Sequence, residues 1–486
     1  MIKYSIIKKI SLSSPYKIAL TDGCQQKLTW QEFARTTLAM VNHIRNSFEL
    51  NLQRPYLFLA KNSIELVLLG AAFATLGIPF QGIDYHLNTQ IIGTLINQIN
   101  AQGVFLSKEL YDSFFFLNEY CPVYEIPTFI TTVMKNSADE TALKDTPKQA
   151  FRSYAFTSGT TGIPKIAIRT KSFDQRRFEY MTEKYHFNPD DIHLTILPMY
   201  HVSATGWLRL FLGLGCTVVI GNFETGCDFC ELLHTCKISA TVLSPHMLSH
   251  LITHIDNHVA HKYFNNLRFV MTGGKNCLAG LKKEAIEKLG NIIYEYYGST
   301  ETGVNTLLDS SEALVYPGSV GRTFSGNDIL VLDSNGIPLK PNQIGRVAIY
   351  SYMNMDNYLN QLCPEVIIGG VRYLLTTDYG YLNSAGYLYL AQRKNPDSKN
   401  IFNFYAIENA TSELSYVADS HVFETTESQS VGINIVLKKY LPYKEIKREI
   451  TTISQQYGFM NPTIRIVQTL NYTQAGKIKF LSTHSL

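Results

Sequence analysis

The segment from Tyr154 to Thr170, YAFTSGTTGIPKIAIRT, combines small hydroxyl-bearing residues with two glycines and a lysine. Hydroxyl and exposed backbone N–H groups can donate hydrogen bonds to an anion, and Lys165 supplies a compensating charge. The segment does not match the pattern G-x-x-x-x-G-K-[ST], because Pro164 precedes Lys165 and Ile166 follows it. It therefore predicts a phosphate loop of another kind, with an ordinary loop between strands as the alternative.

A second group of residues with chemical potential is YEYYGSTETG, from Tyr294 to Gly303. An aromatic ring beside a glycine offers a stacking face, and Thr300 and Glu301 add a hydroxyl donor and a carboxylate. These groups suit a purine, a phosphate oxygen and Mg²⁺ respectively, since Mg²⁺ is usually held by one or two carboxylates together with substrate phosphates. A strand that ends in a polar turn is the alternative.

Two further segments contribute single charged residues. TTDYGYLNSAGYLY contains Asp378, a lone carboxylate between apolar runs that could accept hydrogen bonds from a ribose diol, or could simply be a turn aspartate. Arg393 follows at the start of a polar stretch. Near the C-terminus, TQAGKIK places Lys477 after the flexible Gly476. Alone this is weak evidence, because a lysine near a terminus is usually solvated.

Composition describes the kind of chain that positions these groups. The 486 residues are 45% hydrophobic and 17% charged, which predicts a globular protein of two or three domains. The net charge of +3 is too small to indicate nucleic acid or an acidic membrane surface as a partner. We find no signal peptide and no membrane span. The eight cysteines are too few for a disulfide framework, so we expect reduced thiols in a cytoplasmic protein.

The elements expected from hydrophobic patterning alternate between helix and strand. Helices are predicted over 28–46 and 63–76, and strand-like runs at 55–60, 103–106, 155–157, 194–197, 217–220 and 240–244. This alternation indicates an α/β protein with substantially parallel sheets. Frequent turn signals from 318 to 350 predict a small antiparallel β module, and the polar stretch RKNPDSKN from 393 to 400 predicts a hinge.

Taken together, YAFTSGTTGIPK, YGSTETG, TTDYGYLNSAGYLYLAQR and TQAGKIK resemble, in this order, the signature segments of one superfamily. These are the AMP-forming acyl- and aryl-CoA synthetases, the nonribosomal peptide adenylation domains and the beetle luciferases. The resemblance implies a large N-terminal domain over 1–392, with two α/β subdomains and a small β module. It also implies a small mobile α+β C-terminal domain over 393–486, which would carry the catalytic lysine.

The resemblance also implies a role for each matching residue. The ATP β- and γ-phosphates would be held by the loop residues Thr157, Ser158, Gly159, Thr160, Thr161, Gly162 and Lys165. Tyr297, with Gly298, would stack on adenine, Thr300 would contact the α-phosphate and Glu301 would hold Mg²⁺. Asp378 would bind the ribose hydroxyls with help from Arg393, and Lys477 would bridge the acyl phosphate during adenylation.

The acid site is expected around LPMYHVSATGW, from Leu197 to Trp207, which resembles the P-x-[FY]-H-x-x-G region of acyl- and aryl-CoA synthetases. Tyr200 and His201 would contact the acid, His201 next to its carboxylate, although a hydrogen-bonded core histidine is the alternative. Gly273 and Gly274 are expected to line the acid and adenine sites, together with Gly298. No carboxylate stands among residues 200–203 to pair with an ammonium group, so we expect an aryl or acyl acid without an α-amino group.

The implied reaction is ATP-dependent formation of an acyl-adenylate with release of pyrophosphate, then transfer to a phosphopantetheine thiol of CoA or a carrier protein. The sequence departs from the family after Arg393: KNPDSKNIFNFYAIE has Asn395 at the hinge position and lacks the usual glycines. The acceptor therefore stays open, and an amide synthetase or an amino-acid adenylation enzyme is the alternative. A catalytically inactive binding or scaffold relative is a further alternative, against which the retained Lys165, Glu301, Asp378 and Lys477 argue.

Two other groups of residues could bind a metal. Histidines recur along one predicted helix, at His246, His250, His254 and His258, with His261 after them. Cysteines and a histidine also gather in one short window, at Cys227, Cys230, His234 and Cys236. We favour ordinary helices for both groups. The histidine row begins at Pro245 and lies outside the four signature segments, and the cysteines suit an apolar helix in a reduced compartment.

Overall fold

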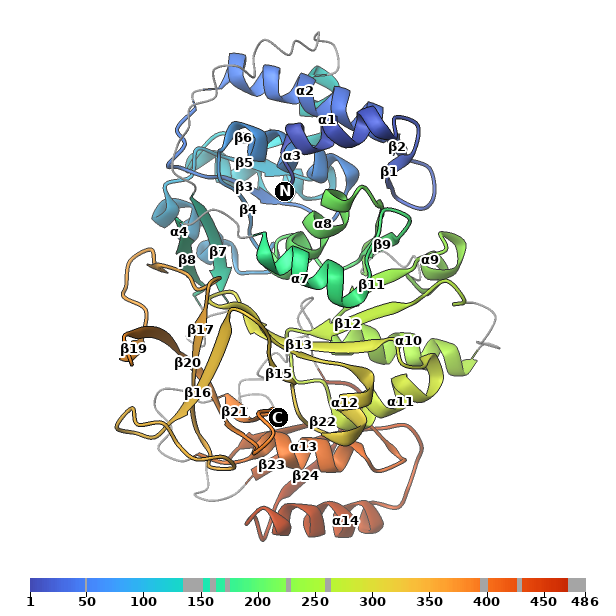
Figure 1. Ribbon diagram of the computed structural model, residues 1–486, viewed down its shortest axis with the longest axis vertical. Coiled ribbons are helices and arrows are strands. Elements are labelled where there is room, and N and C mark those ends of the chain that lie inside the picture. The colour runs from blue at the N-terminus through green and yellow to red at the C-terminus, as the bar shows by residue number, and fades with distance from the viewer. Residues whose placement is uncertain are drawn as a thin grey trace. The chain divides into compact units, whose positions relative to one another are not determined.

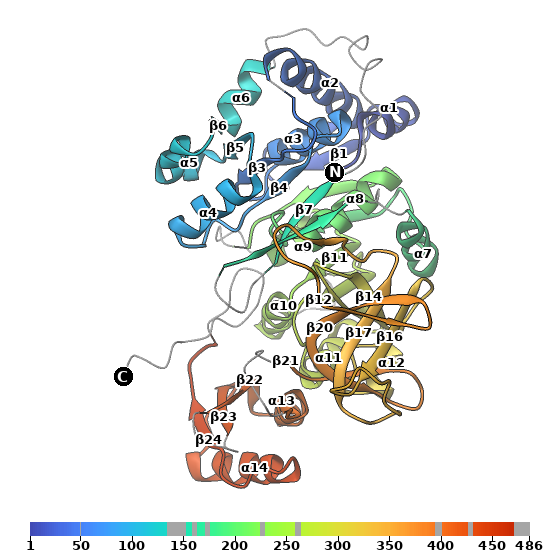
Figure 2. The same ribbon diagram turned by 90° about the vertical axis from the view of Figure 1, so that its left-hand side faces the viewer.

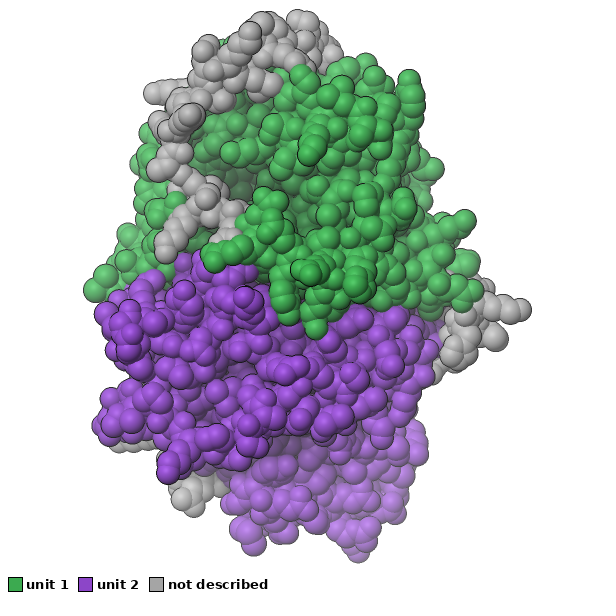
Figure 3. Space-filling view, viewed as in Figure 1, with its two compact units in different colours: residues 1–242, 260–269, 355–362 green, residues 243–259, 270–354, 363–486 purple. Residues whose placement is uncertain are grey.

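The computed structural model describes residues 1–48, 50–133, 152–157, 163–170, 175–223, 229–257, 264–393, 401–425 and 431–470. The chain divides into two compact units, coloured separately in Figure 3. Unit 1 comprises residues 1–242, 260–269 and 355–362, and unit 2 comprises residues 243–259, 270–354 and 363–486. Helices and strands alternate through most of unit 1 (Figure 1), so the predicted α/β class is confirmed.

One sheet of unit 1 is entirely parallel. Its strand order is β4-β3-β5-β6, with β3 at Tyr56–Leu59, β4 at Phe80–Gly82, β5 at Gly103–Leu106 and β6 at Val123–Glu125. The predicted helix over 63–76 is confirmed as α3 (Ile64–Leu76), which begins where the Ser63 side chain accepts the N–H of Leu66 and ends at Gly77 with φ of 74°. That left-handed conformation favours glycine and stops the helix.

Five further strands of unit 1 lie side by side within one larger sheet, in the order β11-β9-β10-β1-β2. They are β1 (Ile18–Thr21), β2 (Lys27–Thr29), β9 (Ile192–Thr195), β10 (Thr217–Ile220) and β11 (Ala240–Leu243). All pairs are parallel except β1 with β2. The predicted helix over 28–46 is α2 (Trp30–Ser47), whose Thr29 and Glu32 form a capping box.

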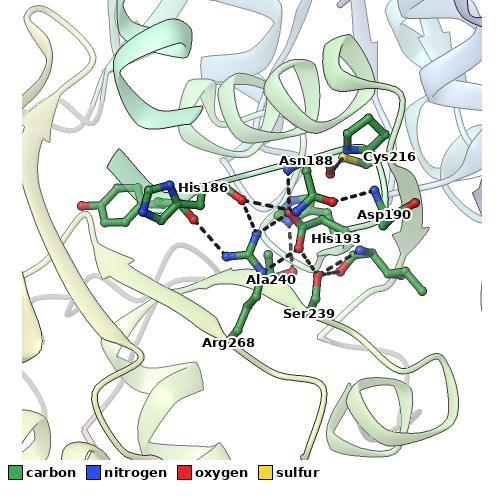
Figure 4. A network of polar contacts seen from close by, with 12 residues as sticks. His186, Asn188, Asp190, His193, Cys216, Ser239, Ala240 and Arg268 are labelled. Carbon is green, nitrogen blue, oxygen red and sulfur yellow. Dashed lines mark hydrogen bonds and ion pairs between the residues drawn. The ribbon is translucent and has the colours of Figure 1, made fainter. Parts of the chain in front are cut away.

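A polar network stabilises the start of β9 (Figure 4). The Arg268 guanidinium donates to both carboxylate oxygens of Asp191, at 2.9 and 2.5 Å, and to the carbonyl groups of Tyr185 and His186, at 2.9 and 3.1 Å. The Ser239 hydroxyl donates to the same carboxylate at 2.6 Å. A bidentate arginine–carboxylate pair is among the strong polar contacts of proteins, so this network fixes the segments that precede β9 and β11.

The remaining helices of unit 1 surround its sheets (Figures 1 and 2). They are α1 (Tyr4–Ser13), α4 (Thr89–Ile99), α5 (Lys108–Phe114), α6 (Ile126–Val133), α7 (Arg176–Tyr185), α8 (Val202–Leu214) and α9 (Phe229–Thr235), with a short 3₁₀ helix at Phe115–Glu119. Within the described ranges no helix combines the length and the apolar character needed to cross a membrane.

Four neighbouring strands of unit 2 have the order β15-β14-β13-β12, with β12 at Phe269–Gly273, β13 at Ile293–Ser299, β14 at Gly303–Leu308 and β15 at Arg322–Thr323. A separate antiparallel sheet is built from β16 (Asn327–Leu332), β17 (Gly345–Ser351), β19 (Glu365–Ile368), β20 (Val371–Leu382) and β21 (Leu388–Arg393). The predicted antiparallel module over 318–350 is thus confirmed, and it continues to residue 393. The helices here are α10 (Pro245–Asn257), α11 (Ala279–Leu289) and α12 (Ser310–Val315).

The C-terminal part of unit 2 has its own core. It consists of α13 (Phe404–Ser412), β22 (Val417–Glu424), β23 (Val431–Leu437), α14 (Tyr443–Gln456) and β24 (Thr463–Ile466), with the strand order β22-β23-β24 (Figure 2). Ile407, Ile433, Ile446 and Ile450 are fully buried in this core. An α+β composition was expected here, and the domain boundary at residue 393 stays a prediction.

Candidate nucleotide- and acid-binding site

The hairpin between β13 and β14 presents Thr300 and Glu301 at its tip. The Ser299 hydroxyl oxygen accepts the N–H groups of Glu301 and Thr302, both at 3.2 Å, which fixes the backbone of the turn. Gly298 is required by close strand pairing, because a Cβ there would lie 2.0 Å from the Gly303 carbonyl oxygen. Thr300 and Glu301 are half-buried, so a ligand at the tip can reach their side chains.

Asp378, Arg393 and Tyr297 form a charged cluster in unit 2. Asp378 on β20 lies directly opposite Arg393 on β21, and the Arg393 Nε is 3.2 Å from the Asp378 Oδ1. The Tyr297 hydroxyl donates to the Asp378 Oδ2 at 2.7 Å. Both Asp378 and Tyr297 are 8% exposed. Three residues that the sequence placed in the nucleotide site therefore meet through direct contacts.

The contacts in this cluster shift the pKa values of Arg393 and Tyr297. The charge of Asp378 raises the pKa of Arg393 above its ordinary value, with Glu301 and Tyr405 contributing in the same direction. Burial, followed by the charge of Asp378 and its hydrogen bond, raises the pKa of Tyr297 well above its ordinary value. Tyr297 is thus a neutral donor, and Asp378 keeps lone pairs for further hydroxyl groups, because an ionised carboxylate has about four acceptor positions.

Gly273, the last residue of β12, and Gly274, which follows it, are each required by a different feature of the structure. A Cβ at Gly273 would lie 2.5 Å from the Tyr296 ring, so glycine permits the close packing of β12 on that ring. Gly274 has φ of 81°, in the left-handed region that favours glycine. Packing and backbone conformation explain both residues, and their expected contacts with the acid and adenine stay predictions.

In unit 1 the predicted phosphate loop joins two paired strands. β7 (Ser153–Thr157) and β8 (Lys165–Arg169) form an antiparallel hairpin in which Thr157 lies opposite Lys165. Thr157 is buried, whereas Lys165 is exposed and its ammonium group lies 5.0 Å from the centre of the Tyr358 ring on β18 (Asn357–Tyr358). The hairpin therefore brings the two ends of the loop together.

The predicted acid residues lie at the start of α8. His201 is the residue that precedes the helix, and its ring lies 4.6 Å from the ring of the buried Tyr200. The loop after β4 packs against this pair, since the Tyr85 ring meets the Tyr200 ring edge-on at 5.6 Å. The same loop contains Asp84, whose carboxyl pKa is influenced by His201.

Asp84 and His86 are candidate site residues that sequence reasoning missed. They lie more than a hundred residues from Tyr200 in the chain, so the sequence around Tyr200 does not reveal them. Nothing in the local sequence FQGIDYHLN points to His201, because the proximity arises from the packing of β4 against a distant segment.

Several predicted residues lie outside the described part of the chain. They are Ser158, Gly159, Thr160, Thr161, Gly162, Lys477, Asn395, Cys227, His258 and His261. Among the described residues, no group of three or more histidine, cysteine, aspartate or glutamate side chains is arranged to hold a metal ion. His246, His250 and His254 lie on α10, and Cys230 and His234 lie on α9, as the helical interpretation expects.

The C-terminal part docks on α11 through several polar contacts. The N–H of Ala279 donates to the Asn409 side chain at 2.9 Å, and the N–H of Gly280 donates to the Ser412 hydroxyl at 3.0 Å. A Cβ at Gly280 would lie 2.1 Å from the Ser412 carbonyl oxygen, so α11 and α13 approach as closely as their backbones allow. This contact fixes α13 against α11.

The fold has close structural counterparts among adenylate-forming enzymes. An amide bond synthetase, McbA from Marinactinospora thermotolerans, matches with a TM-score of 0.82 and 18% identity, covering 98% of this chain and 97% of that one. An o-succinylbenzoate coenzyme A synthetase from Bacillus subtilis in complex with AMP matches with a TM-score of 0.79 and 19% identity, covering 97% and 96%. At these identities the likeness establishes the fold alone.

Sequence comparison gives the family. Residues 10–359 match the AMP-binding enzyme family, and the chain belongs to it. Similar proteins include a fatty acid–[acyl-carrier-protein] ligase of Streptomyces coeruleorubidus, 28% identical over 49% of this chain and 47% of the ligase. A human mitochondrial acyl-coenzyme A synthetase is 25% identical over 71% of this chain and 62% of that protein. The alignments thus cover about half to two thirds of these relatives' length.

Proposed function

We propose that this protein uses ATP to activate a carboxylic acid as its acyl-adenylate, releases pyrophosphate, and then transfers the acyl group to a phosphopantetheine thiol. The observation that supports this most directly is the contact of Tyr297, Asp378 and Arg393 in unit 2. A buried carboxylate with a neighbouring cation and a neutral phenol suits the hydroxyl groups of a ribose. The chain also belongs to the AMP-binding enzyme family, which supports an adenine nucleotide as the molecule that carries this ribose.

The first half-reaction joins two anions. A carboxylate oxygen of the acid attacks the α-phosphorus of ATP, an O–P bond forms, and the bond to pyrophosphate breaks. Catalysis then consists mainly of holding the reactants in line and stabilising charge where it accumulates. We assign charge stabilisation at the phosphates to the loop over 157–165 and Thr300, and the bridging of the acyl phosphate to Lys477.

Mg²⁺ fits the carboxylate of Glu301. This side chain lies half-buried at the tip of a fixed hairpin, and Mg²⁺ needs only one or two carboxylates when substrate phosphates complete its coordination. When bound there, Mg²⁺ would supply positive charge to the phosphate oxygens. The Ser299 hydroxyl orients the backbone that carries Glu301, so the protein places the ligand independently of the metal.

The proposed substrate is an aryl or acyl carboxylic acid without an α-amino group. Similar proteins include a 2-succinylbenzoate–CoA ligase of Lactococcus lactis, 25% identical over 74% of this chain and 75% of that ligase. No carboxylate stands among residues 200–203, and Asp84, which the fold brings into the loop packed on Tyr200, already contacts the His86 Nδ1 at 2.9 Å.

The decisive experiment is acid-dependent exchange of labelled pyrophosphate into ATP. We expect exchange with at least one of a panel of aryl and fatty acids, and a preference of about a hundredfold over the matching α-amino acids. Pairs such as 3-phenylpropanoate and phenylalanine isolate the effect of the ammonium group. Wild-type protein that binds ATP yet exchanges with no acid would contradict the proposal and favour a binding role.

An amide synthetase is the second candidate, supported by the segment after Arg393. KNPDSKN lacks the glycines that let a pantetheine arm pass in related enzymes. Once pyrophosphate exchange has identified an acid that the protein activates, CoA, a phosphopantetheinylated carrier protein and small amines can be compared as acceptors of its acyl group. Thiol-dependent AMP release supports the thiol ligase, and amine-dependent AMP release without any thiol supports the amide synthetase.

A further inference from the structure

Two amide side chains brace the segment that carries the predicted acid residues. This segment forms a turn, because the N–H of His201 donates to the Pro198 carbonyl at 3.0 Å. Met199 and Tyr200, the two residues inside the turn, are both buried. Buried backbone groups need hydrogen-bond partners, and the turn's own hydrogen bond satisfies one pair of them.

Asn62 supplies partners on both sides of Pro198. Its Nδ2 donates to the Leu197 carbonyl at 3.0 Å, and its Oδ1 accepts the Met199 N–H at 2.8 Å. The Nδ2 also donates to the Gly221 carbonyl, at 3.0 Å. The surroundings fix the orientation of this buried amide, because two carbonyl oxygens face its nitrogen and one N–H faces its oxygen.

The backbone of Asn62 is itself held by Asn222. The Asn222 side chain accepts the Asn62 N–H at 2.9 Å and donates to the Asn62 carbonyl at 2.8 Å. Asn62 follows β3, whereas Leu197 follows β9 and Gly221 follows β10, so one amide joins the carboxyl ends of strands that belong to two sheets. In α/β proteins, ligands bind outside the carboxyl ends of the strands. The amide thus lies at the edge where a substrate is expected.

Gln81 holds the other side of the turn. Its Nε2 donates to the Tyr200 carbonyl at 3.2 Å, and a Cβ on the neighbouring Gly82 would lie 2.5 Å from the Tyr200 Cβ. Together with Asn62, this contact holds the backbone immediately before His201 at three points. Side chains carried by a backbone constrained in this way keep their place without a ligand.

We propose that Asn62 and Gln81 are positioning residues for the acid: they hold the turn of residues 198–201 so that Tyr200 and His201 are in place before the acid binds. This inference rests on the proposed function, in which Tyr200 and His201 contact the acid. Neither amide needs to touch the substrate. Because a displacement of about 1 Å can slow a bound reaction strongly, a loosened turn should impair use of the acid without altering the binding of ATP.

The direct test is hydrogen exchange of the full chain, followed by mass spectrometry of peptides that contain the Met199 and His201 amides. In Asn62→Ala the Met199 N–H loses its acceptor, so we expect these amides to exchange at least about tenfold faster than in the wild type. Thr217→Val is the matched control, because it removes only a hydrogen bond to the Ile18 carbonyl at the amino end of β10. It should leave the exchange of the turn unchanged. Unchanged exchange of the turn in a folded Asn62→Ala would overturn the inference.

A kinetic test addresses the use of the acid. With an acid that supports pyrophosphate exchange, Asn62→Ala should raise the KM for the acid at least about fivefold and leave the KM for ATP within about twofold, whereas Thr217→Val should change neither by more than about twofold. An equal rise in both KM values in Asn62→Ala would indicate a general loosening and overturn the inference. Failure of every acid with the wild type would refute the proposed function, whereas hydrogen exchange would still decide whether the amides hold the turn.

Gln81→Leu protects the test if Asn62→Ala does not fold. Gln81 is half-buried, so its loss is better tolerated, and the variant removes the contact with the Tyr200 carbonyl. We expect the same selective rise in the KM for the acid, by about two- to fivefold. An acid KM equal to that of the wild type would contradict the role of Gln81.

Asn62→Asp provides a readout that a general loss of stability would not give. The variant keeps the size of the side chain and an acceptor for the Met199 N–H, but an ionised carboxylate cannot donate to the Leu197 carbonyl. A protonated carboxyl group can donate again. The acid KM of the variant, divided by that of the wild type, should therefore be smaller at about pH 6 than at about pH 8.5. A ratio near one at both pH values would contradict the role of Asn62.

Discussion

At the scale of single residues, Asp378 has the most sharply defined surroundings in the candidate site. Replacing it with asparagine removes the charge that faces Arg393 and one acceptor for the proposed ribose. Hydrogen bonds to charged groups contribute about 1.5 to 3 kcal/mol, so we expect ATP to bind about ten- to a hundredfold more weakly to Asp378→Asn. Isothermal titration calorimetry with ATP measures this loss.

The matched control for this prediction is Tyr297→Phe. It removes only the hydroxyl that donates to Asp378 at 2.7 Å and keeps the ring for stacking. We expect its ATP affinity to change by less than about threefold, because the carboxylate and Arg393 remain paired. Unaltered ATP affinity in a folded Asp378→Asn would show that the carboxylate does not bind the nucleotide.

Glu301 supports a second prediction at this scale. Glu301→Gln keeps the side-chain shape and the backbone hydrogen bond to Ser299 but removes the charge proposed to face Mg²⁺. We expect pyrophosphate exchange to fall at least about tenfold and to recover in part at high Mg²⁺, because a weaker site fills at higher concentration. Glu312→Gln is the control, since that carboxylate accepts a hydrogen bond from Tyr387 and caps α12. Equal Mg²⁺ dependence in Glu301→Gln and the wild type would reject the assignment.

At the scale of secondary structure elements, the contact between α11 and α13 can be tested through Gly280. A methyl group there would lie 2.1 Å from the Ser412 carbonyl oxygen, and backbone atoms cannot give way as a flexible side chain can. We expect Gly280→Ala to loosen α13, seen as at least about tenfold faster hydrogen exchange of its amides, equal to about 1.4 kcal/mol of lost protection.

Gly213→Ala is the control for this helix contact. Gly213 also lies within a helix, α8, but a Cβ there meets no atom within 4 Å. Alanine is a better helix former than glycine by about 1 kcal/mol, so this change should stabilise unit 1 and leave α13 untouched. If the α13 amides of Gly280→Ala exchange hydrogen as slowly as those of the wild type, the contact between α11 and α13 does not stabilise α13.

The elements also mark the limit of what the sequence predicts. Local signals were sufficient for α2 and α3, because Thr29 and Ser63 cap the helices that hydrophobic spacing outlines. The same signals could not give the pairing of Asp378 with Arg393, which depends on the register of β20 and β21 and on its shift between Tyr379 and Gly380. Register is a property of two strands together, and neither segment encodes it alone.

At the scale of the whole molecule, long-range packing decides what local sequence cannot. The family and the residues that meet in the cluster of Tyr297, Asp378 and Arg393 were accessible from four short segments, and the α/β class from the alternation of helix and strand patterns. The packing of the loop after β4 against Tyr200, just before α8, was not accessible in this way, because it joins segments far apart in the chain. The network of Arg268 and Asp191 is similar: four segments contribute to it, and each looks unremarkable in the sequence (Figure 4).

The stability of the fold should depend on pH through His193. This ring is 1% exposed, stacks on Phe211 at 4.1 Å, and lies with its Nδ1 3.1 Å from the Ala240 carbonyl. Burial lowers its pKa to about 3, with the Ala240 carbonyl and Asp191 acting in the opposite direction. In the unfolded chain an ordinary histidine has a pKa of about 6.5. Between these values the unfolded chain binds a proton that the folded chain does not.

Above pH 6.5, His193 is neutral in both the folded and the unfolded chain, so it does not lower the free energy of unfolding. Below pH 6.5, the free energy of unfolding falls by up to about 1.4 kcal/mol per pH unit, until the pH approaches 3. Between pH 7 and pH 5 the wild type should therefore lose about 2 kcal/mol more unfolding free energy than His193→Gln, although the variant is less stable at pH 7.

Urea unfolding followed by tryptophan fluorescence measures the unfolding free energy at each pH, because Trp30 and Trp207 both lie in unit 1 with His193. His234→Gln, at an exposed histidine on α9, controls for the loss of a histidine as such. Equal losses in the wild type and His193→Gln would mean that His193 is not buried in its neutral form.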